Sequence, residues 1–341
     1  MTELEQALQA IEHGLLPVTK DKDHPPTKQD LRQRMSDYKV PGISIAFVYQ
    51  EALAWTKGFG VVEVGREKPV TDETIFQAGS ISKALAAMVA LRLVEDGLLD
   101  LDGDVNDFLR SWKIPKSPHT RVCRDGSQPK VTLRGLLAHS AGLSIKGYSG
   151  YTPDRQIPTL VQILNGEQPA NSKPVQVVQR PGKGYKYSGG GYLVVQQMIE
   201  DVSGRALPVL AKELIFDELG MGYSTFDSRL AEATIPQAAI GHNRSSKPVN
   251  GKWHIYPEQA AGSLWTTPTD LARLIVEIIK SYQNESNRVL SAEMTRQMLT
   301  PHVNIGENWD CGLVFNINHK DEMTIIGHPG WNVGFHCIML S

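Results

Sequence analysis

The sequence predicts a mixed α+β or α/β fold, in which an antiparallel sheet is built from both ends of the chain and a mostly helical segment lies between them. Two β-rich runs near the N-terminus, GISIAFVY and ALAWTKGFGVVEV, are separated only by Gln50 and Glu51, which is typical of an antiparallel hairpin. Three more β-rich runs end the sequence, CGLVFNI, MTIIGH and GFHCIML. Apolar residues at helical spacing occupy much of the region between.

The strongest helical pattern begins at Ile81. Its apolar residues repeat at intervals of three and four as far as Leu93, and Gly97 is expected to end the helix. A second strong helix is expected after Thr267, a plausible cap for a segment that starts with Pro268. The same reasoning predicts further helices over residues 29–38, 133–138, 159–165, 192–202, 207–219 and 292–299.

The composition is that of an ordinary globular protein. The 341 residues include 35 Lys and Arg against 37 Asp and Glu, which gives a net charge of −2, and 41% of the residues are hydrophobic. A balance so close to zero argues against nucleic-acid binding and favours a small-molecule partner. The three cysteines are widely spaced and form neither a disulfide framework nor a metal motif, so we expect no metal and no cofactor.

The N-terminus does not read as an export signal. Glu3 and Glu5 stand where a secretory signal carries Lys or Arg, and the apolar residues recur at helical spacing. The most apolar stretch, residues 84–94, is interrupted by Arg92 and is shorter than the roughly 18 to 20 residues that cross a bilayer. We therefore expect a cytoplasmic protein without a membrane span.

Ser80 and Lys83 are the best candidates for a catalytic pair. They begin and end the Ser-x-x-Lys motif Ser80-Ile81-Ser82-Lys83, and residues three apart on a helix share one face. A serine hydroxyl needs a nearby base to act as a nucleophile, and a lysine can be that base or position another one. The alternative is that Ser80 only caps the helix. A second match, residues 127–130, contains a proline and is expected to be a loop without catalytic geometry.

Two glycine-rich segments could complete a site with Ser80. Tyr187 lies just before three consecutive glycines, Gly189–Gly191, which would allow a substrate to approach the backbone closely. Taken alone, this segment is better explained as a glycine-rich turn with an incidental aromatic residue. The second segment, residues 327–334, reads GHPGWNVG between two β-like runs. An edge strand there could offer a backbone N–H to an oxyanion, while the alternative is a simple hairpin turn.

In this order the segments resemble the serine β-lactamase and penicillin-binding-protein superfamily, in particular the branch with class C β-lactamases, family VIII carboxylesterases and D-amino-acid peptidases. FQAGSISK is similar to the nucleophile segment, YKYSGGGY to the Tyr-x-Asn motif and HPG to the Lys-Thr-Gly motif. VTLRGLLAHSAGL, GLLDLDGDVNDFL, LGM and AAGSLWTTPTDLARL match further landmarks. The resemblance covers nearly the whole chain and implies a β-lactamase/transpeptidase-like fold.

The resemblance also implies roles for individual residues. Ser80 would be the acylated nucleophile, Lys83 its activating partner, and Tyr187 the general base for acylation and for the deacylating water. The backbone N–H groups of Ser80 and Trp331 would hold the oxyanion. The residues that would line the substrate site are Gly189, His328, Gly330 and Asn332.

Two departures from the family pattern bear on the substrate. Gly189 stands where the lactamases carry an asparagine whose amide would bind the substrate's acylamide group. His328 replaces the lysine of Lys-Thr-Gly, which removes a fixed positive charge, and protonation of this histidine near neutral pH would make the activity pH-sensitive. His139 is interpreted as a structural residue of its turn.

We therefore expect a serine hydrolase that forms an acyl-enzyme. The leading interpretation is a carboxylesterase that acts on small esters. A β-lactamase, a D-aminopeptidase or an acyltransferase of the same fold is the near alternative, so the partner is a small ester or amide. The alternative of another class is a catalytically silent binding or scaffold protein, against which the set of Ser80, Lys83 and Tyr187 argues.

The resemblance finally implies two domains. A sheet domain would be split between residues 1–75 and 285–341, and a mostly helical domain, residues 76–284, would carry the nucleophile. In the family the last strand of this sequence is followed by another strand and a helix, so both are expected to be missing after Ser341. Apolar surface left uncovered in this way favours self-association into a homo-oligomer.

Overall fold

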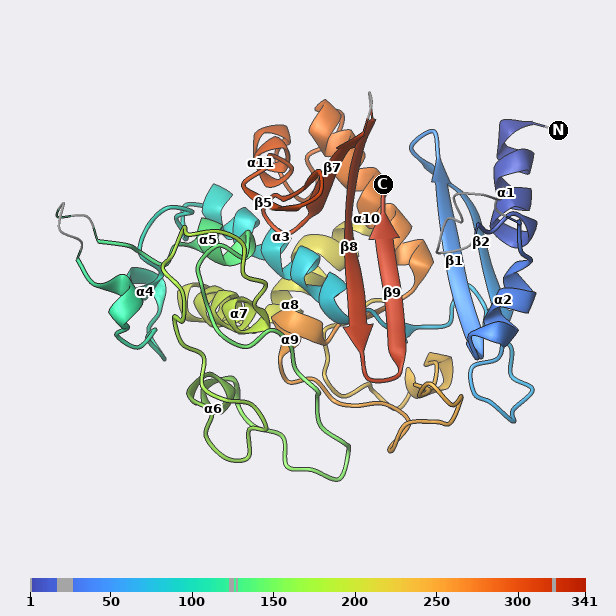
Figure 1. Ribbon diagram of the computed structural model, residues 1–341, viewed down its shortest axis with the longest axis horizontal. Helices are drawn as coiled ribbons and strands as arrows, with labels where there is room; N and C mark the ends of the chain where they lie inside the picture. Colours follow the sequence, from blue (N-terminus) through green and yellow to red (C-terminus); the bar gives the residue numbers. More distant parts are fainter. Residues whose placement is uncertain (1, 17–26, 123–125, 127, 321–322) are drawn as a thin grey trace.

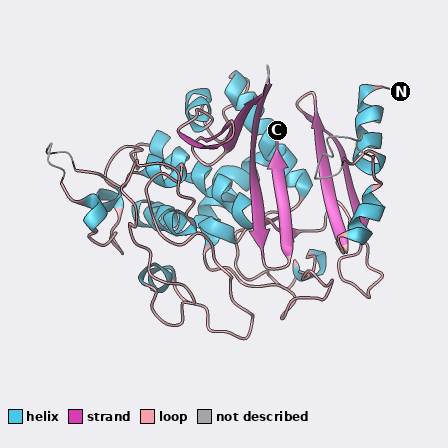
Figure 2. Ribbon diagram, viewed as in Figure 1, coloured by secondary structure: helices cyan, strands magenta, loops and turns pink. Residues whose placement is uncertain are grey.

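The computed structural model describes residues 2–16, 27–122, 126, 128–320 and 323–341, and it confirms the expected fold class (Figures 1 and 2). A hairpin is formed by β1 (Gly42–Tyr49) and β2 (Ala52–Gly60), and β3 (Phe76–Gln77) pairs with β4 (Trp265–Thr266). A five-stranded antiparallel sheet follows the chain order, with β5 (Val303–Gly306), β6 (Trp309–Cys311), β7 (Asn316–Lys320), β8 (Met323–Asn332) and β9 (Phe335–Leu340).

The N-terminal hairpin turns at the two residues that the sequence indicated. Gln50 and Glu51 both have positive φ, 49° and 59°, which suits the right-handed twist of the strands on either side. Helix α10 (Pro268–Gln283) packs against both strands of the hairpin. Helix α10 falls within residues 76–284, the range expected for the helical domain, but it packs against the hairpin of the sheet domain. The domain boundary near residue 284 is therefore kept as a proposal.

The two N-terminal helices lie beside this hairpin (Figure 1). Helix α1 (Glu3–His13) is tied to β1 and β2 through hydrogen bonds from Tyr49 to Glu3 and from Lys57 to Glu12. Helix α2 (Leu31–Asp37) is capped by Asp30, whose side chain accepts from two backbone N–H groups of the first turn.

The helical part is organised around α3 (Ser82–Glu95), in which eleven of fourteen residues are buried. It packs against α7 (Gly189–Ser203), α8 (Leu207–Ala211) and α9 (Gln259–Gly262). The remaining helices are α4 (Val105–Phe108), α5 (Leu133–Leu137), α6 (Leu160–Asn165) and α11 (Ala292–Met298), with short turns η2 (Pro118–Thr120) and η4 (Ile235–Gln237). Within the described ranges, no helix is both long and apolar enough to cross a membrane.

Two helices differ from the sequence-based expectation. Helix α7 begins three residues earlier, because the side chain of Ser188 accepts a hydrogen bond from the N–H of Gly191 and so caps a first turn made of glycines. The expected helix over residues 207–219 is α8 followed by a π-helical turn, η3 (Lys212–Asp217).

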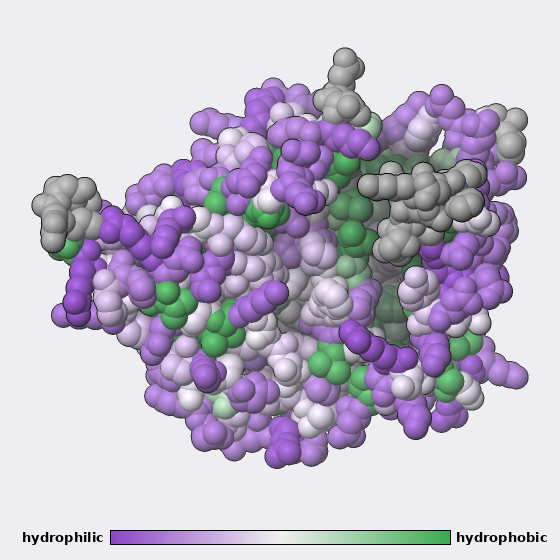
Figure 3. All heavy atoms as spheres, in the orientation of Figure 1, coloured by the Kyte–Doolittle hydropathy of each residue, from purple (hydrophilic) through white to green (hydrophobic). Residues whose placement is uncertain are grey.

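The expectation of one continuous sheet was wrong. The hairpin and the five-stranded sheet do not pair, and a groove of about 1270 Å³ runs between β1 and β9. Apolar residues of both strands and of α10 line it, and apolar side chains are visible along this hollow in Figure 3. Within the described part of the chain no strand bridges the two edges, so the sheet built from both chain ends is divided in two.

The outer face of the last two strands carries exposed apolar side chains. Trp331 is 67% exposed, Ile338 is 65% exposed and Leu340 is 56% exposed. In the β8–β9 register Pro329 faces Ile338 and Trp331 faces His336, which places these side chains on one face. Apolar surface of this kind favours association.

Candidate active site

Ser80 lies in a tight helical turn, η1 (Gly79–Ile81), that leads directly into α3. Gly79 has φ of 51°, and a methyl group at this position would lie 2.4 Å from the backbone nitrogen of Trp331. A methyl group at Gly330 would lie 2.0 Å from the carbonyl oxygen of Ala78. These two glycines therefore allow β8 to touch the serine turn backbone to backbone.

Half of β8 presents an edge to this turn. The strand pairs with β7 only as far as Gly327, and from His328 to Asn332 it pairs with β9 alone. On its other side this half packs against η1. The backbone nitrogen of Trp331 thus lies beside the serine turn, where an N–H group can stabilise negative charge on a reacting oxygen.

The spacing of the Ser-x-x-Lys motif predicts the contact that the structure has. The Lys83 Nζ donates to the Ser80 Oγ at 2.9 Å and to the carbonyl oxygen of Ala261 at 2.7 Å. Lys83 is only 2% exposed. The lysine is therefore fixed between α9 and the serine hydroxyl, in position to exchange a proton with that hydroxyl.

The ring of Tyr187 lies near the Lys83 ammonium group. The Lys83 Nζ is 5.2 Å from the centre of the Tyr187 ring, and the ring of His328 is 6.4 Å from it. The nucleophile turn, the segment before α7 and strand β8 thus bring together four predicted residues, Ser80, Lys83, Tyr187 and His328. The serine of the second motif match, Ser127, lies outside the described residues.

His328 is neutral, so the expectation that it gains a proton near neutral pH was wrong. The side chain is 2% exposed, and its Nδ1 donates to the carbonyl oxygen of Pro329 at 2.7 Å. Burial, and then the positive charge of Lys83, lower the pKa of His328 to about 3. We therefore expect no change in its charge between pH 5 and 8.

Two of the expected substrate-binding residues have close neighbours within the protein. A methyl group at Gly189 would lie 3.3 Å from the Tyr148 Cε2, so the ring of Tyr148 fills the space that a side chain at 189 would enter. The amide of Asn332 donates to the Gln77 Oε1 at 2.9 Å and to the carbonyl oxygen of Gly262 at 2.8 Å. These bonds connect β8 to β3 and α9, and they use both protons of the Asn332 amide.

Glu258 is a buried acid next to the site that the sequence did not reveal. It precedes α9 and lies three residues before Ala261, the residue whose carbonyl holds Lys83. Its side chain is fully buried, and neither carboxyl oxygen bonds to another described residue. Burial raises the pKa of Glu258 to about 8. The phenols of Tyr148, Tyr151 and Tyr256 are close enough for Glu258 to add to the rise in their own pKa values.

We expect Glu258→Gln to stabilise the protein at alkaline pH. An unfolded glutamate loses its proton near pH 4.5, whereas the folded one keeps it until about pH 8. The contribution of Glu258 to wild-type stability should therefore fall as pH rises between these values, by on the order of a few kcal/mol, because the folded state holds the extra proton. Urea unfolding at pH 5, 7 and 9 measures this, and the free-energy difference between variant and wild type should grow with pH.

Glu277 provides the matched control for this experiment. It is also buried, but its carboxylate accepts from the Ser286 hydroxyl and from the backbone N–H of Arg288. Glu277→Gln should cost stability at all three pH values, because a satisfied charge is removed. Parallel pH dependences for wild type and Glu258→Gln would contradict the assignment of Glu258 as a neutral acid.

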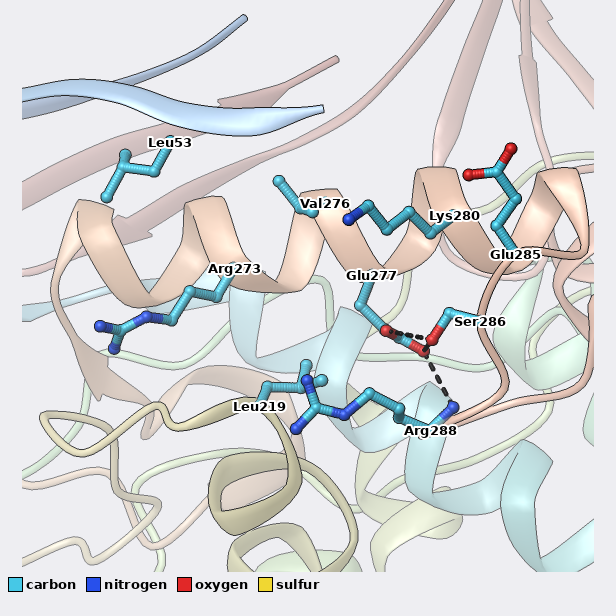
Figure 4. Close-up of a pocket in the computed structure, with 9 residues that line it drawn as sticks. All are labelled: Leu53, Leu219, Arg273, Val276, Glu277, Lys280, Glu285, Ser286 and Arg288. Atoms are coloured by element: carbon cyan, nitrogen blue, oxygen red, sulfur yellow. Dashed lines mark hydrogen bonds between the residues drawn. The ribbon is translucent and has the colours of Figure 1, made fainter. Parts of the chain in front are cut away.

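A second hollow, of about 400 Å³, lies beside α10 (Figure 4). Its lining includes Arg273, Lys280 and Arg288 around Glu277, and the dashed lines in Figure 4 mark the bonds that satisfy this carboxylate. Ser80 lines neither this hollow nor the groove beside β9. Lys83 and Tyr187 are likewise absent from the lining of both hollows, so the serine site lies outside them.

Two curated hydrolases are similar in sequence to this chain. Unguisins hydrolase ungD of Aspergillus violaceofuscus is 24% identical over 275 residues, which are 75% of this chain and 46% of that protein. Esterase EstB of Burkholderia gladioli is 27% identical over 201 residues, 57% of this chain and 48% of that protein. The chain spans about two fifths to a half of the first curated relatives it matches.

A solved structure shows the same architecture. The octameric penicillin-binding protein homologue from Pyrococcus abyssi superposes with a TM-score of 0.70 at 26% identity, over 88% of this chain and 66% of that chain. Fold and site together define a member of the serine β-lactamase and penicillin-binding-protein superfamily. Residues 27–340 match the family described as Beta-lactamase, and the chain belongs to that family.

Proposed function

We propose that this protein is a serine hydrolase that forms an acyl-enzyme at Ser80 and acts on small neutral esters. The observation that carries the proposal is the 2.9 Å hydrogen bond from the buried Lys83 Nζ to the Ser80 Oγ. This bond joins the two parts that nucleophilic catalysis needs, a hydroxyl that is only partly buried and a proton-exchanging group fixed beside it.

In the proposed reaction the Ser80 Oγ attacks the acyl carbonyl while its proton passes, with the help of Lys83, to Tyr187. The backbone N–H groups of Ser80 and Trp331 stabilise the oxyanion. The C–O bond to the alcohol then breaks, and the leaving alkoxide takes the proton from Tyr187. Tyr187 next removes a proton from water, whose oxygen attacks the acyl carbonyl of the Ser80 ester. The bond to the Ser80 Oγ breaks, the Oγ takes the proton back from Tyr187, and the acid is released.

The preference for esters rests on charge and space around the serine. His328 is neutral and stands where the resemblance places the lysine of the lactamases, so it offers no fixed positive charge to a carboxylate. The space beside Gly189 holds the Tyr148 ring, so no amide is available at that position for an acylamide group. The similarity to EstB supports the same substrate class. Lactam or amide hydrolysis and acyl transfer to an alcohol are the alternatives.

A substrate panel tests this proposal. Purified protein is assayed with p-nitrophenyl acetate and butyrate, with nitrocefin and with D-alanyl p-nitroanilide, and Ser80→Ala is the blank for each. We expect kcat/KM for the esters to exceed the other values by about 100-fold or more, because no group is placed to bind the carboxylate of a lactam. Faster turnover of nitrocefin or of the anilide would replace the esterase proposal by the corresponding alternative.

We also propose that the protein forms a homo-oligomer. The support is the exposed apolar face of β8 and β9 with Trp331, Ile338 and Leu340, and the Pyrococcus abyssi homologue is described as octameric. Burial of such a face between copies would remove apolar surface from water.

A further inference from the structure

His139 makes three contacts with the segment that holds Tyr187. Its carbonyl oxygen accepts from the backbone N–H of Lys186 at 2.7 Å, and its Nδ1 accepts from the backbone N–H of Ser188 at 3.1 Å. Its ring lies against the ring of Tyr187, with 4.2 Å between the ring centres. One histidine thus binds both neighbours of Tyr187 and packs on Tyr187 itself.

The histidine is itself held in place. It is 2% exposed and has φ of 54°, so the turn after α5 directs the carbonyl and the ring toward the Tyr187 segment together. Because Nδ1 accepts a hydrogen bond, the neutral ring carries its proton on Nε2. Burial, and then the charge of Lys83, hold the pKa of His139 well below its ordinary value. A protonated ring could not accept from Ser188, so this neutrality preserves the contact.

The downstream part of the segment has other anchors. The Ser188 hydroxyl donates to the carbonyl oxygen of Ser144, and the N–H groups of Gly189 and Gly190 donate to Lys146 and Ile145. These bonds fix the start of α7. They lie on one side of Tyr187, whereas His139 binds on both sides of it.

We propose that His139 is a positioning residue, which holds the ring of Tyr187 beside Lys83 and Ser80 by binding both flanking peptide groups and packing on the ring. This inference rests on the proposed function, because it assigns His139 an effect on catalysis only through Tyr187. It predicts that the energetic effect of His139 on kcat disappears once the Tyr187 hydroxyl is absent.

The test is a double-mutant cycle with p-nitrophenyl acetate. His139→Ala removes the ring and the Nδ1 acceptor, and we expect it to lower kcat by about 100-fold with KM changed by about threefold or less. In a Tyr187→Phe background the same His139→Ala change should lower kcat by about threefold or less. Equal effects of His139→Ala in the wild-type and Tyr187→Phe backgrounds would overturn the proposal. A histidine with a purely structural role would lower kcat by the same factor whether or not the Tyr187 hydroxyl is present.

Two further variants separate positioning from folding. His139→Asn should recover most of the kcat, because the Asn Oδ1 can accept from Ser188 and asparagine tolerates the left-handed φ. Trp112→Phe is the stability control, since it removes the hydrogen bond from the buried Trp112 indole to Asn165, outside the proposed site. It should lower the thermal midpoint and leave kcat unchanged. His139→Asn no more active than His139→Ala would contradict the role of the Ser188 contact.

The cycle also distinguishes failure of this inference from failure of the proposed function. Full activity of the Tyr187→Phe single variant would remove Tyr187 from the mechanism, and the proposed function would then need another base. An impaired Tyr187→Phe with additive His139 effects would leave the proposed function intact and exclude only the positioning role.

Discussion

Ser80→Ala is expected to lower kcat/KM for p-nitrophenyl butyrate by about 10⁴-fold or more, because the substitution removes the attacking hydroxyl. Ser80 is not part of the hydrophobic core, and its Oγ is hydrogen-bonded to the Lys83 Nζ. Removing this oxygen therefore leaves the packing of the core unchanged. The variant should therefore unfold at nearly the same urea concentration as wild type. Initial rates at substrate concentrations well below KM measure the loss.

The sequence offers a control for this substitution. Ser127 belongs to the second Ser-x-x-Lys match, and Ser127→Ala should keep nearly full activity. Equal losses in the two variants would contradict the assignment of Ser80, and so would an active Ser80→Ala.

Lys83→Met is expected to lower kcat by about 10³-fold or more, since proton transfer from the Ser80 hydroxyl loses its fixed partner. Methionine fills the apolar part of the lysine side chain but has no donor for the Ser80 Oγ or for the carbonyl oxygen of Ala261. Acylation should be slowed most, so the rate of labelling by a fluorophosphonate should fall together with kcat.

The variant Lys83→Arg tests whether the lysine is needed for its positive charge or for its ability to exchange a proton. Arginine keeps the positive charge but does not give up its proton, so this variant should be nearly as inactive as Lys83→Met. Lys57→Met is the matched control, because Lys57 bonds to Glu12 on the hairpin side and should not affect catalysis. Substantial activity in Lys83→Arg would indicate that the lysine acts only through its charge.

Local patterns in the sequence predicted the local features of the site. The three-residue spacing of Ser80 and Lys83 lies within one helical turn, and their contact follows from that geometry. The hairpin turn at Gln50 and Glu51 likewise depends on adjacent residues. In such cases the sequence separation is so small that backbone geometry alone brings the groups together.

Features that depend on distant segments could not be predicted in this way. Ala261 is 178 residues from the lysine it holds, and the bond from Ser188 to His139 spans 49 residues. The neutral states of His328 and Glu258 follow from burial, which is a property of the packed fold. The division of the sheet at the groove between β1 and β9 is also a tertiary feature. Sequence patterns predict where strands lie along the chain but not which strands pair with each other.

The central claim is that Ser80 becomes covalently acylated, and intact-mass spectrometry with a fluorophosphonate probe tests it most directly. Wild-type protein should gain the mass of one probe adduct, and peptide mapping should place it on Ser80. The Ser80→Ala variant, folded by the same urea criterion, should gain none. An adduct on another residue, or no adduct on folded wild-type protein, would contradict the account.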